Sequence, residues 1–211
     1  MKIIECPRDA MQGLHDFIPT EKKALYINQL LKVGFDTIDF GSFVSPKAIP
    51  QLKDTAQVLD QLDLTRTKSK LLAIIANLRG AEDAIQFEEI DYLGFPLSIS
   101  EQFQKRNTNK SIADALITVA DIQNLCQKNN KTLVTYISMG FGNPYGEAFN
   151  EEIVAGFVEK LATLGVKIIS LSDTIGVAAP EVINSIFRTS INAYPSIEFG
   201  AHFHSTPDKT L

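Results

Sequence analysis

Two histidines near the end of the chain, His202 and His204, have the spacing of a metal-binding pair. They follow the apolar run Ile197-Glu198-Phe199, which predicts a short strand. Side chains at positions i and i+2 of a strand point to the same face, so both imidazoles should be directed at one point. A third ligand would come from another strand end, and Asp9 is the candidate because it follows the first apolar run. The alternative is that the pair is only two polar residues on a strand edge.

Polar residues also follow the other predicted strands, at the point where each strand ends. These clusters are Arg8-Asp9, Asp39, Asn77, Ser138-Met139-Gly140 and Ser172-Asp173-Thr174. In a closed parallel barrel all C-terminal strand ends meet around one cavity, whereas in an open doubly wound sheet only those near the switch point converge. The recurrence of the clusters favours the barrel. No GxGxxG follows the first strand, so the dinucleotide-binding alternative lacks its main signal.

The hydrophobic pattern predicts strands that alternate with helices along the whole chain. Thr20 is expected to cap the first helix, and two polar stretches, residues 7–18 and 98–110, are expected to be loops. The expected strands are residues 2–5, 37–40, 70–76, 90–96, 132–138, 167–171 and 197–203. The expected helices are residues 21–32, 51–62, 79–88, 111–128, 151–164 and 180–193.

We therefore predict an α/β fold of the TIM (β/α)8-barrel type, in a single domain over residues 1–211 with about seven βα units. A barrel of seven strands leaves two edges with unpaired backbone groups, which is costly. The chain ends at Leu211, just where another helix would begin after Pro207. The expectation is that a C-terminal portion of the domain lies outside this sequence.

Composition and charge restrict the class of partner. Of the 211 residues, 45% are hydrophobic and 21% are charged, and the net charge is −5 without a basic tract, so no nucleic-acid partner is expected. No stretch is apolar enough to span a membrane, and no signal-peptide core is present at the N-terminus. The two cysteines, Cys6 and Cys126, form no disulfide framework and fit a reducing compartment. A cytoplasmic protein with a small-molecule substrate is expected.

Several motifs together resemble 3-hydroxy-3-methylglutaryl-CoA lyase, within the wider group of metal-dependent barrel lyases and Claisen-type synthases. The arginine-aspartate turn and the HxH pair mark the wider group, whereas the stretches at residues 42–47 and 140–147 are similar to the lyase in particular. The motifs are Pro7-Arg8-Asp9-Ala10-Met11-Gln12, Ser42-Phe43-Val44-Ser45-Pro46-Lys47, Asn77-Leu78-Arg79-Gly80, Ser100-Glu101-Gln102-Phe103, Gly140-Phe141-Gly142-Asn143-Pro144-Tyr145-Gly146-Glu147, Ser172-Asp173-Thr174-Ile175-Gly176-Val177 and His202-Phe203-His204.

The resemblance implies cleavage of 3-hydroxy-3-methylglutaryl-CoA to acetyl-CoA and acetoacetate. It also implies a divalent cation, Mg²⁺ or Mn²⁺, held by Asp9, His202 and His204. Such a cation lowers the pKa of the substrate hydroxyl and orients the substrate. Arg8 is placed to stabilise negative charge on the thioester enolate, and its alternative role is a salt bridge to Asp39 or Asp173.

The resemblance assigns further residues. Gln12 corresponds to a position beside the substrate, with a loop hydrogen bond as the alternative, and Asp39 stands where the family has a glutamate near the arginine. Asp173 is a candidate proton shuttle, with an N-cap or a structural ion pair as the alternative. Asn107 is a candidate contact to coenzyme A. The alternative is that its charged segment is only a solvent-exposed surface. Phe203 is expected to pack behind the histidines.

The sequence also departs from the family pattern. His15 stands where the family has lysine, and Ser205 stands where it has aspartate. The family's catalytic cysteine and an asparagine ligand fall beyond Leu211, so the 211-residue chain alone is expected to be inactive or nearly so. Two alternative functions are a condensing enzyme of the isopropylmalate or homocitrate synthase type and a non-catalytic degenerate barrel. A homodimer is expected only by analogy with the family.

Overall fold

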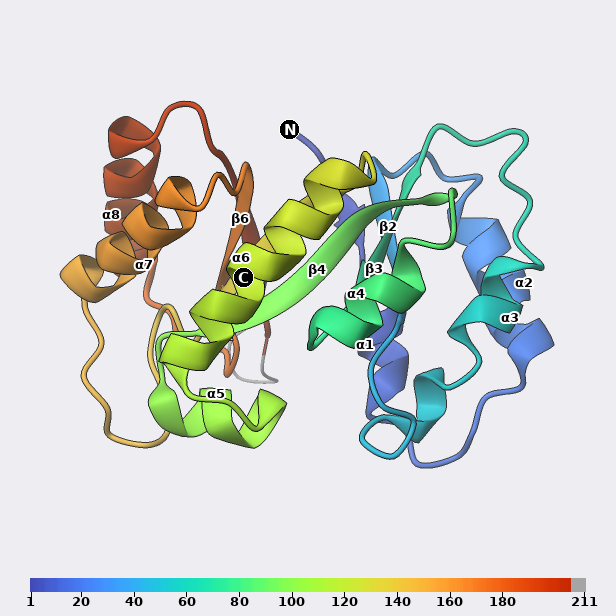
Figure 1. Cartoon of the computed structure of the whole chain (residues 1–211), viewed down its shortest axis with the longest axis horizontal. Helices are drawn as coiled ribbons and strands as arrows, with labels where there is room; N and C mark the ends of the chain where they lie inside the picture. Colours follow the sequence, from blue (N-terminus) through green and yellow to red (C-terminus); the bar gives the residue numbers. More distant parts are fainter. Residues whose placement is uncertain (206–211) are drawn as a thin grey trace. The chain divides into compact units, whose positions relative to one another are not determined.

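The computed structural model describes residues 1–205, and the chain divides into two compact units at residue 94. Strands and helices alternate along the chain (Figure 1). Residues 1–205 hold seven strands and eight α-helices, and the strands follow one another in the sheet in chain order. Every strand pair of known register is parallel. The predicted α/β fold of the TIM-barrel type is confirmed.

The first unit contains four successive strands, the last of which continues into the second unit. Its elements are β1 (Ile4–Glu5), α1 (Pro7–Gln12), α2 (Thr20–Leu30), β2 (Thr37–Ser42), a 3-10 helix η1 (Pro50–Leu52), α3 (Thr55–Leu59), β3 (Lys70–Ile74), α4 (Leu78–Ala84) and the start of β4 (Ile90–Ser98). The elements of the second unit are the end of β4, α5 (Glu101–Thr108), α6 (Ile112–Lys128), β5 (Thr132–Ser138), α7 (Glu151–Thr163), β6 (Ile168–Asp173), α8 (Pro180–Ala193) and β7 (Glu198–Phe203).

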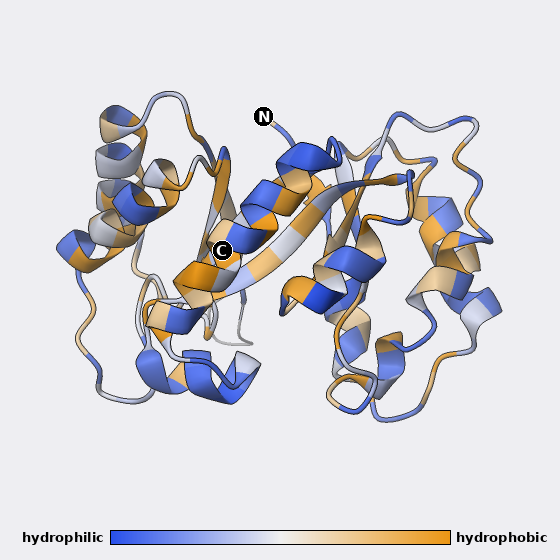
Figure 2. Ribbon diagram, in the orientation of Figure 1, coloured by the Kyte–Doolittle hydropathy of each residue, from blue (hydrophilic) through white to orange (hydrophobic). Residues whose placement is uncertain are grey.

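Strands β2 to β6 are mostly buried on both faces, whereas β1 and β7 are half-buried or exposed along their length. β2 is buried at all six positions, and Ile38, Ala73 and Leu93 of three neighbouring strands are fully enclosed in the first unit. In the second unit Ile137 of β5 and Ile169 of β6 are likewise fully enclosed. Figure 2 shows hydrophobic residues interleaved with hydrophilic ones along α6, as expected for a helix with one face on a sheet. Parallel strands covered by helices have this continuous apolar character.

Side-chain caps set the start of several helices. The Oδ1 atom of Asn77 accepts from the amide of Gly80 at the start of α4, and Asn150 accepts from the amide of Ile153 at the start of α7. Gly80 has a second role, since a Cβ there would lie 2.3 Å from the carbonyl oxygen of Phe43. The helices predicted at residues 79–88, 111–128 and 151–164 begin within one residue of their predicted starts, because Asn77, Ser111 and Asn150 satisfy the first free amides.

Both polar stretches expected to be loops contain helices. Residues 7–12 form α1, in which Pro7 occupies the first turn and Met11 is buried. Residues 101–108 form α5, which is capped by the hydroxyl of Ser100. A proline in the first turn and a serine N-cap are helix-start signals, and the polar character of both segments masked them.

Smaller expectations were also wrong. Thr20 is the first residue of α2 rather than its cap, because Pro19 takes the N-cap position and the Thr20 hydroxyl donates to Asp54 Oδ2 at 2.7 Å. The helix expected at residues 51–62 is divided into η1 and α3. The helix expected after Pro207 lies outside the described residues.

Among helices of residues 1–205, none has both the length and the apolar character to cross a membrane.

Candidate active site

Arg8 is fixed by a buried carboxylate on the neighbouring strand of the first unit. The Nη2 atom of Arg8 donates to Asp39 Oδ2 at 2.5 Å, and its Nε atom lies 3.1 Å from both carboxylate oxygens. Asp39 on β2 is completely buried and Arg8 on α1 is 7% exposed. A guanidinium held this way has a fixed plane and direction, because two parallel contacts to one carboxylate remove its rotational freedom.

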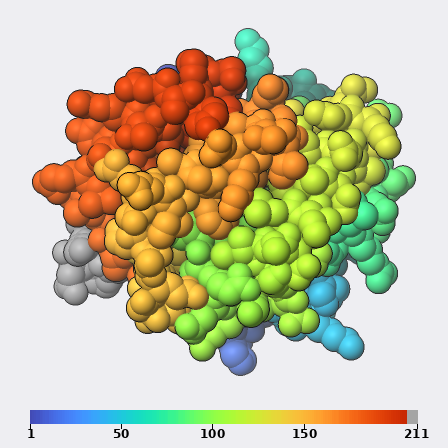
Figure 3. Space-filling model, turned by 60° about the vertical axis from the view of Figure 1, so that its left-hand side comes forward, coloured from blue at the N-terminus to red at the C-terminus, as the bar shows by residue number. Residues whose placement is uncertain are grey.

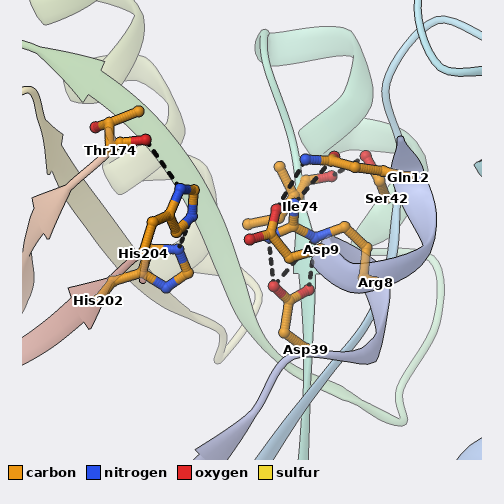
Figure 4. Close-up of polar contacts among 9 residues, drawn as sticks. All are labelled: Arg8, Asp9, Gln12, Asp39, Ser42, Ile74, Thr174, His202 and His204. Atoms are coloured by element: carbon orange, nitrogen blue, oxygen red, sulfur yellow. Dashed lines mark hydrogen bonds and ion pairs between the residues drawn. The ribbon is translucent and has the colours of Figure 1, made fainter. Parts of the chain in front are cut away.

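The remaining nitrogen of Arg8 organises the exposed side of the same cluster. Its Nη1 atom donates to Asp9 Oδ1 at 2.8 Å and to Gln12 Oε1 at 3.0 Å, while Gln12 Nε2 donates to Asp9 Oδ1 at 2.8 Å (Figure 4). The three side chains occupy positions i, i+1 and i+4 of α1, and the spacing lets Gln12 reach back over one turn. The Asp9 carboxylate therefore has a defined orientation in α1, the helix that follows β1.

The two histidines of the second unit face one another at the end of β7. Their Nε2 atoms lie 3.2 Å apart, so the prediction that the i, i+2 spacing directs both rings to one point is confirmed (Figure 4). The Nδ1 atom of His204 lies 2.9 Å from the carbonyl oxygen of Thr174. A carbonyl only accepts hydrogen bonds, so Nδ1 of His204 carries a proton and its Nε2 holds a lone pair when the ring is neutral.

The separation of the two Nε2 atoms fits a shared cation. Neighbouring ligands of an octahedral ion with bonds of about 2.1 Å lie about 3.0 Å apart. Neighbouring ligands of a tetrahedral zinc site lie about 3.3 Å apart. The observed 3.2 Å agrees with both geometries within the usual tolerance. The donor set of this pair therefore fits a divalent cation.

Aromatic residues support the histidine strand on either face. Phe203 packs edge-on against Phe141, with ring centroids 5.4 Å apart, and also contacts Phe187 of α8. The expectation that Phe203 packs behind the histidines is confirmed. On the opposite face the ring of Tyr136 on β5 lies edge-on to His202, with centroids 5.6 Å apart. The strand alternation therefore separates the packing face from the histidine face.

Asp173 and Asn107 lie in different surroundings within the second unit. Asp173 ends β6 and is 4% exposed, and its two oxygens accept hydrogen bonds from the amides of Val177 and Ala178 at 3.0 and 2.8 Å. Asn107 is exposed on α5. The structure brings Asp173 to the end of β6 beside the histidine strand, since the amide of His204 donates to the Asp173 carbonyl at 3.2 Å.

Cys6 immediately precedes the arginine helix, yet the thiol has the character of a core residue. Desolvation by burial raises the pKa of Cys6 to about 12, with a further increase from the nearby Asp39 carboxylate. A nucleophilic cysteine needs a lowered pKa. The raised pKa therefore indicates a thiol that is inert as a nucleophile.

Within each unit, the structure brings together one group of the predicted residues. Arg8, Asp9, Gln12 and Asp39 form one hydrogen-bonded cluster in the first unit. His202 and His204 form the second group, in the second unit. Because Asp9 belongs to the first unit and the histidines to the second, their joint ligation of one cation stays a prediction.

Sequence reasoning missed the contribution of Thr174. The residue was noticed as part of a polar cluster, but the group that contacts His204 is its backbone carbonyl. No side-chain pattern reports the direction of a carbonyl group. The sequence did contain one sign of the turn after β6, namely the glycine at position 176. Its φ of 68° in the structure is a conformation that glycine adopts readily.

An apolar groove of the second unit is lined by other residues than these. It has a volume of about 480 Å³ and is lined by Leu116, Ile117 and Ala120 of α6 together with facing residues of α7. On the face shown in Figure 3 the surfaces of α6 (yellow-green) and α7 (orange) adjoin. The groove holds none of the predicted site residues, so it is not the candidate active site.

Known proteins resemble the chain over almost its whole length. The HMGL-like family model matches residues 2–208. The hydroxymethylglutaryl-CoA lyase YngG of Bacillus subtilis is 34% identical over 97% of this chain and 68% of its own length. The crystal structure of the Bacillus subtilis HMG-CoA lyase superposes with a TM-score of 0.90 over 96% of this chain and 68% of that chain, at 34% identity.

A second solved structure is similar to this chain in fold and in sequence. It is an HMG-CoA lyase from Acinetobacter baumannii in complex with coenzyme A and 3-methylmalate, with a TM-score of 0.89, 31% identity, and coverage of 96% of this chain and 66% of that chain. The sequence thus spans about two thirds of the length of these relatives. The fold and these relatives together define a lyase-like enzyme of the TIM-barrel class. The chain belongs to the HMGL-like family.

Proposed function

We propose that this protein is a carbon–carbon lyase that cleaves 3-hydroxy-3-methylglutaryl-CoA to acetyl-CoA and acetoacetate with a divalent cation. The observation that carries the proposal is the histidine pair. The two Nε2 atoms lie 3.2 Å apart, and Nδ1 of His204 contacts the carbonyl oxygen of Thr174. Membership of the HMGL-like family supports the class of reaction. The relative that binds coenzyme A supports an acyl-CoA substrate.

Asp9, His202 and His204 would hold the cation, which is Mg²⁺ or Mn²⁺ in this proposal. The three residues offer one carboxylate and two imidazoles, a donor set that these ions accept. When bound, the ion supplies a Lewis acid that lowers the pKa of the substrate hydroxyl and fixes its position. The hydrogen bonds of Asp9 to Arg8 and Gln12 orient the carboxylate before any ligand arrives.

Arg8 would stabilise the charge that develops on the thioester oxygen. Cleavage next to a tertiary alcohol moves the hydroxyl proton to a base such as solvent water, turns the alcohol carbon into the ketone of acetoacetate and leaves the electron pair of the broken bond on the thioester enolate. A proton taken up at the enolate carbon then gives acetyl-CoA. A cationic donor with a fixed direction stabilises that enolate more than the ground state. Asp39 holds the Arg8 guanidinium in one orientation, because it is fully buried and accepts hydrogen bonds from two nitrogens of Arg8.

A cytoplasmic location and a homodimer are further parts of the proposal. The location is supported by the two cysteines, which fit a reducing compartment. The dimer is supported only by analogy with the family. Sedimentation velocity over a range of protein concentrations measures the oligomeric state directly.

The experiment that tests the function combines turnover with equilibrium binding, so that a slow enzyme is still detected. The purified chain is incubated with 3-hydroxy-3-methylglutaryl-CoA and Mn²⁺, and acetoacetate and acetyl-CoA are quantified with and without chelator. A parallel reaction contains acetyl-CoA and a 2-oxo acid. Binding of Mn²⁺ and of the thioester is measured by calorimetry.

The expected result is Mn²⁺-dependent binding of 3-hydroxy-3-methylglutaryl-CoA, with any turnover confined to the cleavage reaction. Condensation of acetyl-CoA with the 2-oxo acid would assign the protein to the other branch of the barrel synthases. Absence of both Mn²⁺ binding and thioester binding would overturn the proposal and favour a non-catalytic barrel.

A further inference from the structure

The turn that follows β6 is built around one buried carboxylate. Asp173 accepts hydrogen bonds from the amides of Val177 and Ala178, one on each oxygen. The chain can double back in this way because Gly176 adopts a φ of 68°, a conformation that glycine tolerates best. The segment Asp173–Ala178 is therefore closed into a loop by the side chain of its first residue.

The same turn is tied to the neighbouring strands at its beginning. The amide of Met139, which follows β5, donates to Thr174 Oγ1 at 2.8 Å, and the amide of Gly140 donates to the carbonyl of Ser172 at 3.2 Å. On the other side the amide of His204 donates to the Asp173 carbonyl at 3.2 Å. Thr174 is thus held by its hydroxyl, by the preceding residue and by the closed loop that follows.

The held residue directs its carbonyl oxygen at His204. The distance from the Thr174 carbonyl oxygen to Nδ1 of His204 is 2.9 Å, as Figure 4 shows. The contact selects the tautomer in which Nδ1 is protonated and Nε2 is available, and it fixes the rotation of the ring. In the second unit, the Nε2 atom then faces Nε2 of His202.

We infer that Asp173 and Thr174 are positioning residues for His204, and that they prepare its ring for a cation by holding the carbonyl of Thr174 in place. The inference rests on the proposed function, since it assigns His204 to the cation. It gives Asp173 a role other than that of a proton shuttle. Both of its oxygens already accept from backbone amides, and the residue is 4% exposed.

The positioning role predicts a spectroscopic signature in the protein without metal. The wild-type protein, labelled with ¹⁵N-histidine, should show the neutral His204 ring as the Nδ1-protonated tautomer. In Asp173→Asn an amide group replaces one acceptor oxygen, so one of the two amide contacts is lost and the loop opens. The His204 ring should then populate both tautomers, and Mn²⁺ affinity should fall by about tenfold or more. Asp121→Asn, an exposed carboxylate on α6, is the matched control.

A second pair of variants tests the same role with less disturbance of charge. Thr174→Val removes the hydroxyl that accepts from Met139, whereas Thr174→Ser keeps it. The valine variant should repeat the tautomer change and the loss of Mn²⁺ affinity, and the serine variant should retain the wild-type signature. Folding of each variant is verified by circular dichroism.

The outcomes distinguish this inference from the proposed function. A retained Nδ1-protonated His204 and unchanged Mn²⁺ affinity in folded Asp173→Asn and Thr174→Val would overturn the positioning role. A wild-type protein with the predicted tautomer and no Mn²⁺ binding would refute the cation site. The histidine orientation would remain established by the tautomer measurement alone.

Discussion

At the scale of single residues, the buried Arg8–Asp39 pair stabilises the fold as well as the site. Asp39 is completely buried, so its charge depends on the guanidinium that it contacts at 2.5 Å. Removing Arg8 takes the guanidinium away from the buried Asp39 carboxylate, which costs about 3–5 kcal/mol of unfolding free energy. Arg8→Gln should destabilise the protein by about this amount, as measured by urea unfolding, and Asp39→Asn should destabilise it less, because Arg8 keeps its ion pair with Asp9.

A variant with both substitutions separates the energy of the Arg8–Asp39 interaction from the other effects of each substitution on stability. Arg8→Gln with Asp39→Asn removes both charges, so its destabilisation should be clearly smaller than the sum of the single effects. Lys105→Gln is the control, because Lys105 and Glu101 form an exposed pair on α5 and such pairs contribute little. Additive losses in the double variant would show that the two residues act independently.

At the scale of secondary-structure elements, β5 contains a buried polar atom to which no residue among 1–205 offers a hydrogen bond. Among the described residues, Thr135 Oγ1 is a buried side-chain oxygen of this kind, and the residue is fully enclosed. Burial without a partner costs about 1–3 kcal/mol, so Thr135→Val should raise the unfolding free energy by about 1 kcal/mol. Thr118→Val on α6 should lower it, since Thr118 donates to the carbonyl of Asp114. Equal effects of both substitutions in chemical unfolding would contradict this interpretation.

Helix α6 also carries a titratable group that is protected by packing. Burial raises the pKa of Cys126 to about 12, from a value of 9.0 in a solvated thiol. The folded state therefore favours the neutral thiol. The contribution of the neutral Cys126 thiol to the unfolding free energy is complete below pH 9 and is lost as the pH rises towards 12.

In a Cys6→Ser variant at pH 8, iodoacetamide should label Cys126 on the order of 10³-fold more slowly in the native state than in urea. The rate of alkylation is measured by mass spectrometry. Labelling at the same rate in both conditions would show that the helix exposes the thiol.

The sequence predicted the elements that have strong periodicity or caps. Residues 132–138 and 180–193 were predicted with the bounds that the structure has, because continuous apolar residues and Pro180 mark them clearly. Helices α1 and α5 were missed because their residues are mostly polar. The facing histidines follow from the two-residue period of a strand, whereas the contact with the Thr174 carbonyl depends on a backbone turn that no side-chain pattern reports.

At the scale of the whole molecule, the proposed cation would link residues that belong to the two units. Asp9 lies on α1 of the first unit, whereas His202 lies on β7 of the second unit and His204 directly follows that strand. A ligand that binds only the folded protein raises its unfolding free energy according to its concentration and its Kd. A cation held by all three residues therefore makes the stability of both units depend on the metal concentration.

The corresponding measurement is thermal unfolding with Mn²⁺ and with chelator. At about 100 times the Kd, Mn²⁺ should stabilise the protein by about 2.7 kcal/mol, which raises Tm by about 5–10 °C for a chain of this size. Asp9→Asn, His202→Gln and His204→Gln should each abolish most of this shift. His15→Gln is the matched control, because the third histidine of the chain is fully exposed and pairs with its neighbour Asp16. If the histidine variants lose the shift but Asp9→Asn retains it, the histidine pair binds the ion without Asp9, and the three-ligand centre is wrong.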